Sequence, residues 1–282
     1  MEARILQLGR TFAVAVHAYA ILDNHFHIVL EVDPSAPQGW SDEEVARRWL
    51  QLQGADDAKA PEWGTRMATL CRQPERLVEL RNRLGSLSWF MRALKEPIAR
   101  RANAEDDCSG RFWEGRFRSQ ILLDEAALLS AMVYVDLNPA RAGISASATS
   151  SPHTSIRRRV ETCADQNAPL SPLVASVDSD SLAISHLGYR DLVLWTASSL
   201  GRGSEGPDHE FPTLPAALRL LPLEPTQWLA QVVATETRYW RAIGAFEAMV
   251  AHAAERGLRW LRGIGTARAI AARGPGRVTW PP

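Results

Sequence analysis

The sequence predicts an α+β protein, and three observations support that class. The apolar runs Val14–Leu22 and Phe26–Val32 are separated by Asp23-Asn24, a pair typical of tight turns, so they predict a β-hairpin. Residues Phe117–Leu123 alternate in side-chain character, which predicts a further strand. Apolar residues at helical spacing fill much of the remaining chain, so we expect helices to cover the sheet.

Capping residues and prolines locate the ends of the expected helices. Ser41 and Glu44 form a capping box that opens a helix ending near Leu52. Pro97 predicts a kink or a break near Glu96 in the next strong helix. The helices expected before Phe117 are Glu2–Phe12, Ser41–Leu52, Arg76–Leu84 and Leu87–Asn103.

Composition divides the chain into four consecutive parts. Residues 1–144 contain the predicted strands, and residues 145–184 are rich in Ser, Thr, Ala and Pro, which predicts a flexible linker. Residues 185–272 predict a small all-α domain, with helices at Pro225–Val233 and Tyr239–Ala254. Residues 273–282 predict a disordered tail. The expected core anchors of the helical domain are Trp195, Trp228, Trp240 and Trp260.

The overall composition is compatible with an enzyme that acts on DNA but does not require one. The 282 residues have a hydrophobic content of 46% and a formal net charge of zero, so the chain as a whole does not attract DNA. Cys71, Cys108 and Cys163 have neither zinc-site nor disulfide spacing, which suits a reducing compartment. We find no secretory signal and no apolar run long enough to span a bilayer, and therefore expect a cytoplasmic protein without a membrane partner.

Two histidines at the start of the second apolar run form the first candidate site. His25 and His27 flank Phe26, and alternate side chains of a strand share a face, so both imidazoles point the same way. Two imidazoles on one face can chelate a divalent cation. The alternative is an edge strand with two solvated histidines.

A tyrosine and an asparagine form the second candidate site. Asp124 is a good N-cap for a helix that Pro139 and Gly143 end. Tyr134 and Asn138 are four residues apart on this helix and therefore share a face. The alternative is a half-buried tyrosine that packs against the sheet.

Taken together, these residues resemble a known family. His25-Phe26-His27 and Tyr134-Val-Asp-Leu-Asn138-Pro-Ala-Arg-Ala-Gly143, with Phe112-Trp-Glu-Gly-Arg-Phe117 between them, look like a single-tyrosine HUH transposase, and most closely like the REP-associated tyrosine transposases. The resemblance covers roughly residues 1–145. It implies a ferredoxin-like antiparallel sheet with helices on one face.

The resemblance also implies a chemistry. His25, His27 and Asn138 would hold Mg²⁺ or Mn²⁺, which polarises a scissile phosphate in single-stranded or hairpin DNA. Tyr134 would attack that phosphate and form a 5′-phosphotyrosine link, which conserves the phosphodiester energy for strand joining. Some relatives work as dimers that exchange the tyrosine helix, so a homodimer is a further expectation.

The expected DNA-binding residues are basic side chains on and after the helix Leu87–Asn103. In the family this helix packs on the sheet and helps to line the DNA path. The alternative for any single arginine is a solvated basic face. The residues expected to contact DNA phosphates are Arg92, Lys95, Arg100, Arg101, Arg116 and Arg118.

The sequence departs from the family pattern at its start. About twelve residues precede Ala13, so the family's first strand is absent and we expect an exposed strand edge and lower stability. A misassigned start codon or a decayed copy would explain this difference. Two alternatives to a transposase therefore stay open: a non-catalytic DNA-binding remnant, and a metal-dependent phosphoesterase that uses water, with Tyr134 structural.

Overall fold

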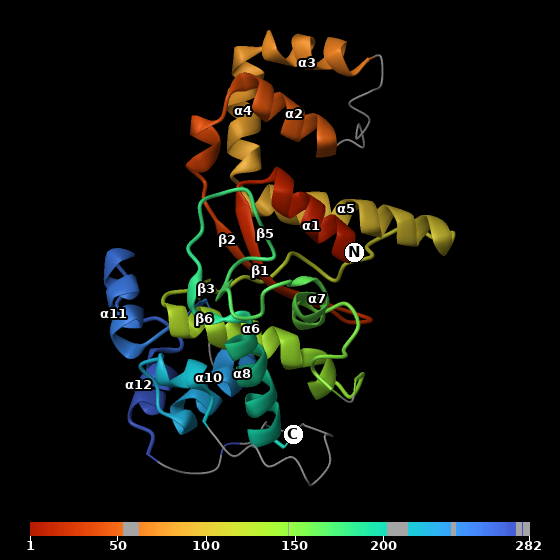
Figure 1. The fold of residues 1–282 in the computed structure, drawn as a ribbon. Helices are drawn as coiled ribbons and strands as arrows, with labels where there is room; N and C mark the ends of the chain where they lie inside the picture. Colours follow the sequence, from red (N-terminus) through yellow and green to blue (C-terminus); the bar gives the residue numbers. More distant parts are fainter. Residues whose placement is uncertain (53–61, 146, 202–213, 238–240, 275–277, 279–282) are drawn as a thin grey trace. The chain divides into compact units, whose positions relative to one another are not determined.

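The computed structural model describes residues 1–52, 62–145, 147–201, 214–237, 241–274 and 278, which form a mixed α+β structure with a small antiparallel sheet (Figure 1). The chain divides into two units. Unit 1 contains residues 1–16, 30–117 and 172–179, and unit 2 contains residues 17–29, 118–171 and 180–282. Each unit therefore combines distant segments, unlike the four consecutive parts expected from composition.

The predicted hairpin is confirmed. Strand β1 is Val14–Ile21 and strand β2 is Phe26–Val32. The Leu22 N–H donates to the His25 carbonyl at 2.9 Å, next to the Asp23-Asn24 turn. All residues of β1 from Val14 to Ala20 are buried, so the strand has cover on both faces, as its largely apolar sequence suggests.

The sheet has the order β2-β1-β5, where β5 is Val174–Ala175, so the histidine-bearing strand β2 stands at one edge. The opposite edge of β1 is covered by the segment 153–176. In unit 1, the N–H groups of Leu173 and Ser176 donate to the Val16 and Val14 carbonyls at 2.8 and 3.1 Å. In unit 2, the Ile21 N–H donates to the His153 carbonyl at 3.2 Å.

The same segment overturns the prediction of a flexible linker over residues 145–184. It contains helix α7, Ser155–Thr162, and three short strands: Pro169–Leu170 (β4), β5 and Leu182–Ser185 (β6). Strands β4 and β6 pair antiparallel. Composition missed this order because the segment depends on distant partners: a few apolar residues such as Ile156 and Leu170 reach the core, and backbone groups bond to β1.

In unit 1, helices pack around the hairpin ends. Phe12 and Phe90 meet edge to face with ring centroids 5.6 Å apart. A Cβ on Gly9 would lie 2.5 Å from Val174 Cγ1, so glycine allows α1 to lie against the sheet. The helices are α1 Glu2–Thr11, α2 Asp42–Leu52, α3 Trp63–Cys71, α4 Pro74–Leu84 and α5 Leu87–Glu105, with a 3₁₀ turn at Ala36–Gly39.

The predicted cap at Ser41 is confirmed, and the structure adds a second cap at Ser86. The Ser41 hydroxyl accepts the Glu44 N–H at 3.2 Å before α2, and the Ser86 hydroxyl accepts the Trp89 N–H at 3.5 Å at the start of α5. Pro97 lies inside α5, which continues to Glu105, so the proline does not end the helix.

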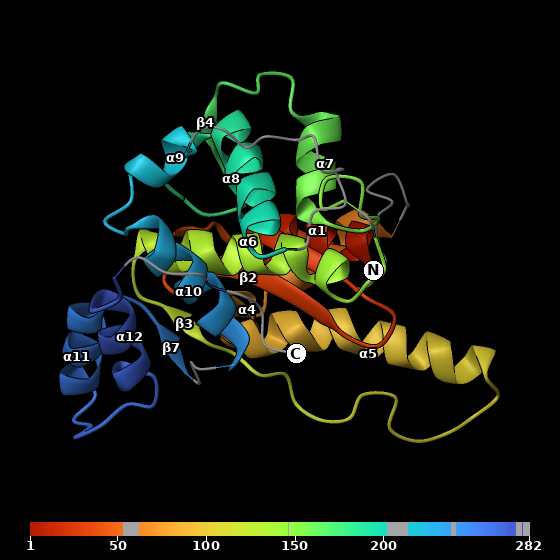
Figure 2. The same ribbon diagram turned by 90° about the horizontal axis from the view of Figure 1, so that it is seen from below.

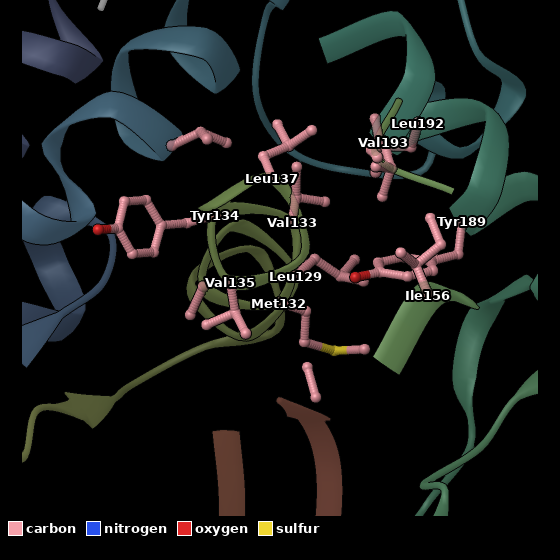
Figure 3. Close-up of a cluster of buried hydrophobic side chains, with 14 of the residues drawn as sticks. Leu129, Met132, Val133, Tyr134, Val135, Leu137, Ile156, Tyr189, Leu192 and Val193 are labelled. Carbon is pink, nitrogen blue, oxygen red and sulfur yellow. The ribbon is translucent and has the colours of Figure 1, made fainter. Parts of the chain in front are cut away.

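Unit 2 is built around helix α6, Glu125–Arg141, which is buried on all sides (Figure 3). Asp124 caps it by accepting the Ala127 N–H at 2.8 Å, as predicted. Helices α8, His186–Ser199, and α10, Pro225–Thr237, pack against α6 (Figure 2). A helix buried all round carries apolar residues on every face, which the run around Met132 and Val133 shows.

The rest of unit 2 corrects two predictions. The strand expected over Phe117–Leu123 covers only Ile121–Leu122 (β3), which pairs in parallel with Ala242–Ile243 (β7). The helix expected over Tyr239–Ala254 begins instead at Phe246, because Ala242 and Ile243 form β7; Tyr239 itself lies outside the described residues. The remaining helices are α9 Ala216–Arg219, α11 Phe246–Glu255 and α12 Ile264–Ala271.

Two of the predicted tryptophan core anchors can be judged clearly. Trp228 is fully buried, and its indole N–H donates to the Thr196 hydroxyl at 3.0 Å, as expected. Trp260 is 64% exposed, so its prediction as a core residue is wrong. Trp240 lies outside the described residues, as does most of the expected disordered tail, residues 273–282. None of the described helices is long and apolar enough to cross a membrane.

Candidate active site

The two histidines lie beside each other at the start of β2. The ring centroids of His25 and His27 are 5.1 Å apart, with the rings nearly perpendicular. His25 is exposed, and its Nδ1 lies 2.6 Å from Asn24 Oδ1, whereas His27 is half-buried. The strand geometry therefore brings the two imidazoles together, as the spacing predicts.

Tyr134 approaches the histidines from helix α6. Its ring centroid is 5.6 Å from that of His27, and the two rings meet edge to face. Tyr134 is only 3% exposed. Unit 2 thus joins residues about a hundred positions apart in the sequence, and it places the candidate nucleophile against the histidine pair.

Arg141 links Tyr134 to Asn138 along the same helix. One guanidinium nitrogen, Nη2, donates to the Tyr134 hydroxyl at 3.2 Å and lies 3.5 Å from Asn138 Oδ1. The guanidinium carbon is 5.5 Å from the centre of the Tyr134 ring. A cation so placed favours negative charge on the phenolic oxygen. Sequence reasoning did not single out Arg141, although its place one turn after Asn138 was a usable clue.

The buried side-chain amide of Asn138 is the feature that bears on metal binding. Its side chain is 1% exposed, and its Nδ2 atom is buried without a hydrogen-bond partner among the described residues. Buried polar atoms are seldom unpaired, so this N–H group faces a position that a hydrogen-bond acceptor would satisfy, whereas a cation would need the amide oxygen. Amide oxygen and nitrogen exchange places by a half-turn of the group.

The donor types of His25, His27 and Asn138 are compatible with a small divalent cation. Imidazole nitrogen and amide oxygen are donors that Mn²⁺ accepts and that Mg²⁺ tolerates beside water. The described residues contain no group of three or more His, Cys, Asp or Glu side chains arranged for a metal, so any site here depends on the asparagine as the third donor.

A buried carboxylate on α6, missed by sequence reasoning, fixes the opposite side of the helix. Asp136 accepts hydrogen bonds from the Ser155 hydroxyl at 2.5 Å, the Ile156 N–H at 3.0 Å and the Tyr189 hydroxyl at 2.6 Å. Burial raises the pKa of Asp136 to about 6, against the lowering effect of these bonds and of Arg159. Figure 3 shows Tyr189 and Ile156 on the side of α6 away from Tyr134.

Arg159 extends this network to β1. Its guanidinium donates to the His17 carbonyl at 2.8 Å and to the Ser171 carbonyl at 2.8 Å, and it lies 3.4 Å from His186 Nδ1. Burial lowers the pKa of Arg159 and that of His186. The sequence did contain a clue, since Asp136 interrupts an apolar helix and a buried charge requires partners.

The predicted DNA-binding residues of α5 are engaged with neighbouring groups. Arg92 and Arg100 both pair with Glu96, at 3.1 and 2.8 Å, and Arg101 pairs with Glu105 at 2.7 Å. Exposed pairs of this kind contribute only about 0–1 kcal/mol, so phosphates can replace the carboxylates.

The other predicted contacts differ in environment. Lys95 donates to the Gly115 carbonyl at 2.9 Å and lies 4.9 Å from the Trp113 ring centre, and burial lowers its pKa. Arg116 and Arg118 are exposed and lie outside regular elements. Arg116 belongs to unit 1 and Arg118 to unit 2.

Comparison of the chain with models of protein families, with curated proteins and with solved structures found no match.

Proposed function

We propose that the chain cleaves and rejoins single-stranded or hairpin DNA through Tyr134, as the resemblance to the REP-associated tyrosine transposases implies. The observation that supports this proposal is the contact between Tyr134 and His27, 5.6 Å apart at their ring centroids, beside His25. A tyrosine nucleophile and a histidine pair are the two parts that such a reaction needs at one place.

In the proposed reaction, the Tyr134 oxygen attacks the phosphorus in line and the phosphorus–O3′ bond breaks. The phenolic proton passes to solvent, and the released 3′ oxygen takes up a proton from water. Arg141 stabilises the phenolic oxygen as it loses its proton, because its Nη2 already donates to that oxygen at 3.2 Å. The reverse attack by a 3′-hydroxyl rejoins the strand and restores the tyrosine.

His25, His27 and Asn138 would hold Mg²⁺ or Mn²⁺, which supplies charge to offset the developing negative charge on the phosphate oxygens. The half-buried His27 and the buried Asn138 restrict water on one side of this position, while the exposed His25 leaves the other side open to a DNA strand.

The proposal extends to the fold and the setting of the protein. The ferredoxin-like arrangement is proposed from the resemblance, and residues 185–272 are proposed to form a mainly helical accessory region that includes the short strand β7. The proposed partner is DNA in the cytoplasm, with a homodimer as a further expectation.

A second candidate function is favoured by the burial of Tyr134. With 3% of its surface exposed, the phenol is less accessible than His25, so a phosphoesterase could use water at the histidine pair while Tyr134 stays structural. The two functions differ in their products, since only the tyrosine reaction leaves protein on the DNA.

End-labelled DNA separates the two functions. The tyrosine reaction predicts that a 3′-end label on a hairpin oligonucleotide becomes attached to the protein after denaturation, while a 5′-end label is released on a shorter strand. The phosphoesterase reaction predicts that the 5′-end label and the 3′-end label each appear on a shortened strand, with no protein attached to either. Loss of both products in EDTA and in His25→Ala/His27→Ala would support the metal position, and normal cleavage in either case would contradict it.

A further inference from the structure

The connection between α11 and α12 has a backbone that is fixed at both ends. Gly257 adopts a φ of +64°, and the N–H groups of Leu258 and Gly257 donate to the carbonyls of Ala253 and Ala254 at 2.9 and 3.0 Å. These two bonds form a Schellman motif, in which glycine is favoured. Gly263, with a φ of +109°, opens α12 at the other end. We call residues 256–263 the Trp260 turn.

The Trp260 turn presents its indole outward while its neighbour anchors it. Leu261 is 6% exposed and packs in the core formed with α11 and α12, whereas Trp260 is 64% exposed. Among the exposed large apolar side chains of the described residues, this fraction is the highest. Figure 2 shows α11 and α12 side by side, joined by this turn. A large aromatic side chain held outward on a rigid turn loses little entropy when it binds.

Arginines lie on both sides of Trp260 in the sequence, and their salt bridges differ from those of the α5 arginines. Arg256 and Arg259 are exposed and form no salt bridge within the described residues, while Arg92, Arg100 and Arg101 all pair with glutamates. Between His252 and Ile264 the sequence has three arginines and only one acidic residue, Glu255. An exposed indole on a short turn that also carries two exposed arginines without salt bridges in the described residues matches a ligand with a flat aromatic face and negative charges.

We propose that the Trp260 turn binds single-stranded nucleic acid, with an unpaired base stacked on Trp260 and phosphates paired with Arg256 and Arg259. Duplex DNA does not offer a free base face, so the ligand is a single strand. An acidic peptide would satisfy the arginines but would leave the indole without a flat partner. Trp260 lies between α11 and α12 whereas Tyr134 lies on α6, and the proposed binding does not depend on cleavage.

Fluorescence anisotropy of a labelled oligothymidylate with the full chain tests this proposal. Trp260→Ala should weaken binding by about 5- to 150-fold, since one stacked base has an effect of that order, and Trp260→Phe should restore part of the loss. Arg256→Gln/Arg259→Gln should reduce the slope of log K against log salt by roughly 1.4, which is about 0.7 for each phosphate on a single strand.

Arg219 and Leu220 supply the matched control, because they place an exposed arginine beside an apolar side chain that is 60% exposed but not aromatic. Arg219→Gln/Leu220→Ala should bind as the wild type does. Unchanged binding by Trp260→Ala, equal affinity for duplex DNA, or equally effective competition by polyglutamate would each overturn the proposal. Tyr134→Phe should keep this binding, so failure of the cleavage reaction and failure of this site give different results.

Discussion

At the scale of single residues, Asp136 shows how the fold holds the candidate nucleophile in place. Its carboxylate accepts three hydrogen bonds from Ser155, Ile156 and Tyr189, on the side of α6 away from Tyr134. This arrangement fixes the rotation of α6, and therefore the direction in which Tyr134 points. Removing the Asp136 carboxylate would leave three buried donors without this acceptor, which costs more than the hydrogen bonds themselves contribute.

The raised pKa of Asp136 predicts how stability changes with pH. Because the folded-state pKa is about 6 and the ordinary value is 3.8, the protonated form is favoured in the fold. The protonated carboxyl therefore adds to the free energy of unfolding. This contribution is fully present below pH 3.8 and is lost as pH rises through about 6, which lowers the free energy of unfolding by about 3 kcal/mol. Asp136→Asn cannot ionise, so its free energy of unfolding should lack this decrease.

Urea unfolding between pH 4 and 7.5, compared for wild type and Asp136→Asn, measures this difference. The lowered pKa of His186 gives an opposite trend in both proteins, so subtraction removes it. Parallel pH profiles for the two proteins would show that Asp136 does not titrate as its burial implies.

Arg141 gives a second prediction at this scale. Arg141→Gln should slow formation of the covalent adduct by about 10- to 100-fold, because a hydrogen bond from a charged group contributes about 1.5–3 kcal/mol. Arg141→Lys keeps the positive charge, so its rate of adduct formation should fall less than that of Arg141→Gln. Single-turnover rates as a function of pH measure the effect, and equal rates for all three proteins would remove Arg141 from the reaction.

At the scale of elements, the segment 153–176 completes the sheet that the hairpin begins. It donates N–H groups to β1 at Val14 and Val16, and Arg159 donates to the His17 carbonyl at 2.8 Å. The sequence predicts an exposed strand edge, whereas in the structure this side of β1 is covered. Strand edges left unpaired favour association with other chains, so this cover limits such contacts.

Amide hydrogen exchange tests this cover directly. The N–H groups of Leu173 and Ser176 donate to β1 and should exchange slowly, while that of Ala175, between them, should exchange much faster. A flexible linker would exchange quickly and uniformly across residues 172–177, which would contradict the observed pairing.

Local patterns predicted the elements that local chemistry determines. The hairpin followed from its two apolar runs and Asp23-Asn24, and α6 followed from the cap at Asp124. The order of residues 145–184 was not predictable from composition, because it depends on partners such as Asp136 and β1 that are distant in the sequence. Trp260 was misjudged because apolar character alone does not distinguish a buried side chain from a presented one.

The candidate site was predicted in part. Spacing placed His25 with His27, and Tyr134 with Asn138, on common faces, and the resemblance joined the two pairs. Arg141 was not expected, because its bond to Tyr134 depends on the side-chain geometry of the last turn of α6. The pairing of α5 arginines with Glu96 and Glu105 was also missed, although the spacing of four residues allows such pairs.

At the scale of the whole molecule, a net charge of zero means that DNA binding must depend on local groups. Arg100 and Arg101 have side chains that are 78% and 82% exposed. If α5 lines the DNA path, Arg100→Gln/Arg101→Gln should reduce the salt slope of single-strand binding by roughly 1.4, and Arg219→Gln should not change it. An unchanged slope in the double variant would exclude these arginines from the DNA path.

The central claim is that Tyr134 forms a covalent bond with DNA, and peptide mass spectrometry tests it most directly. After incubation with hairpin DNA and Mn²⁺, followed by nuclease and protease digestion, the peptide that contains Tyr134 should carry a nucleotide phosphate through its 5′ oxygen. Tyr134→Phe should yield only the unmodified peptide while still binding DNA. A modified peptide that maps to another residue, or an adduct that persists in Tyr134→Phe, would contradict the claim.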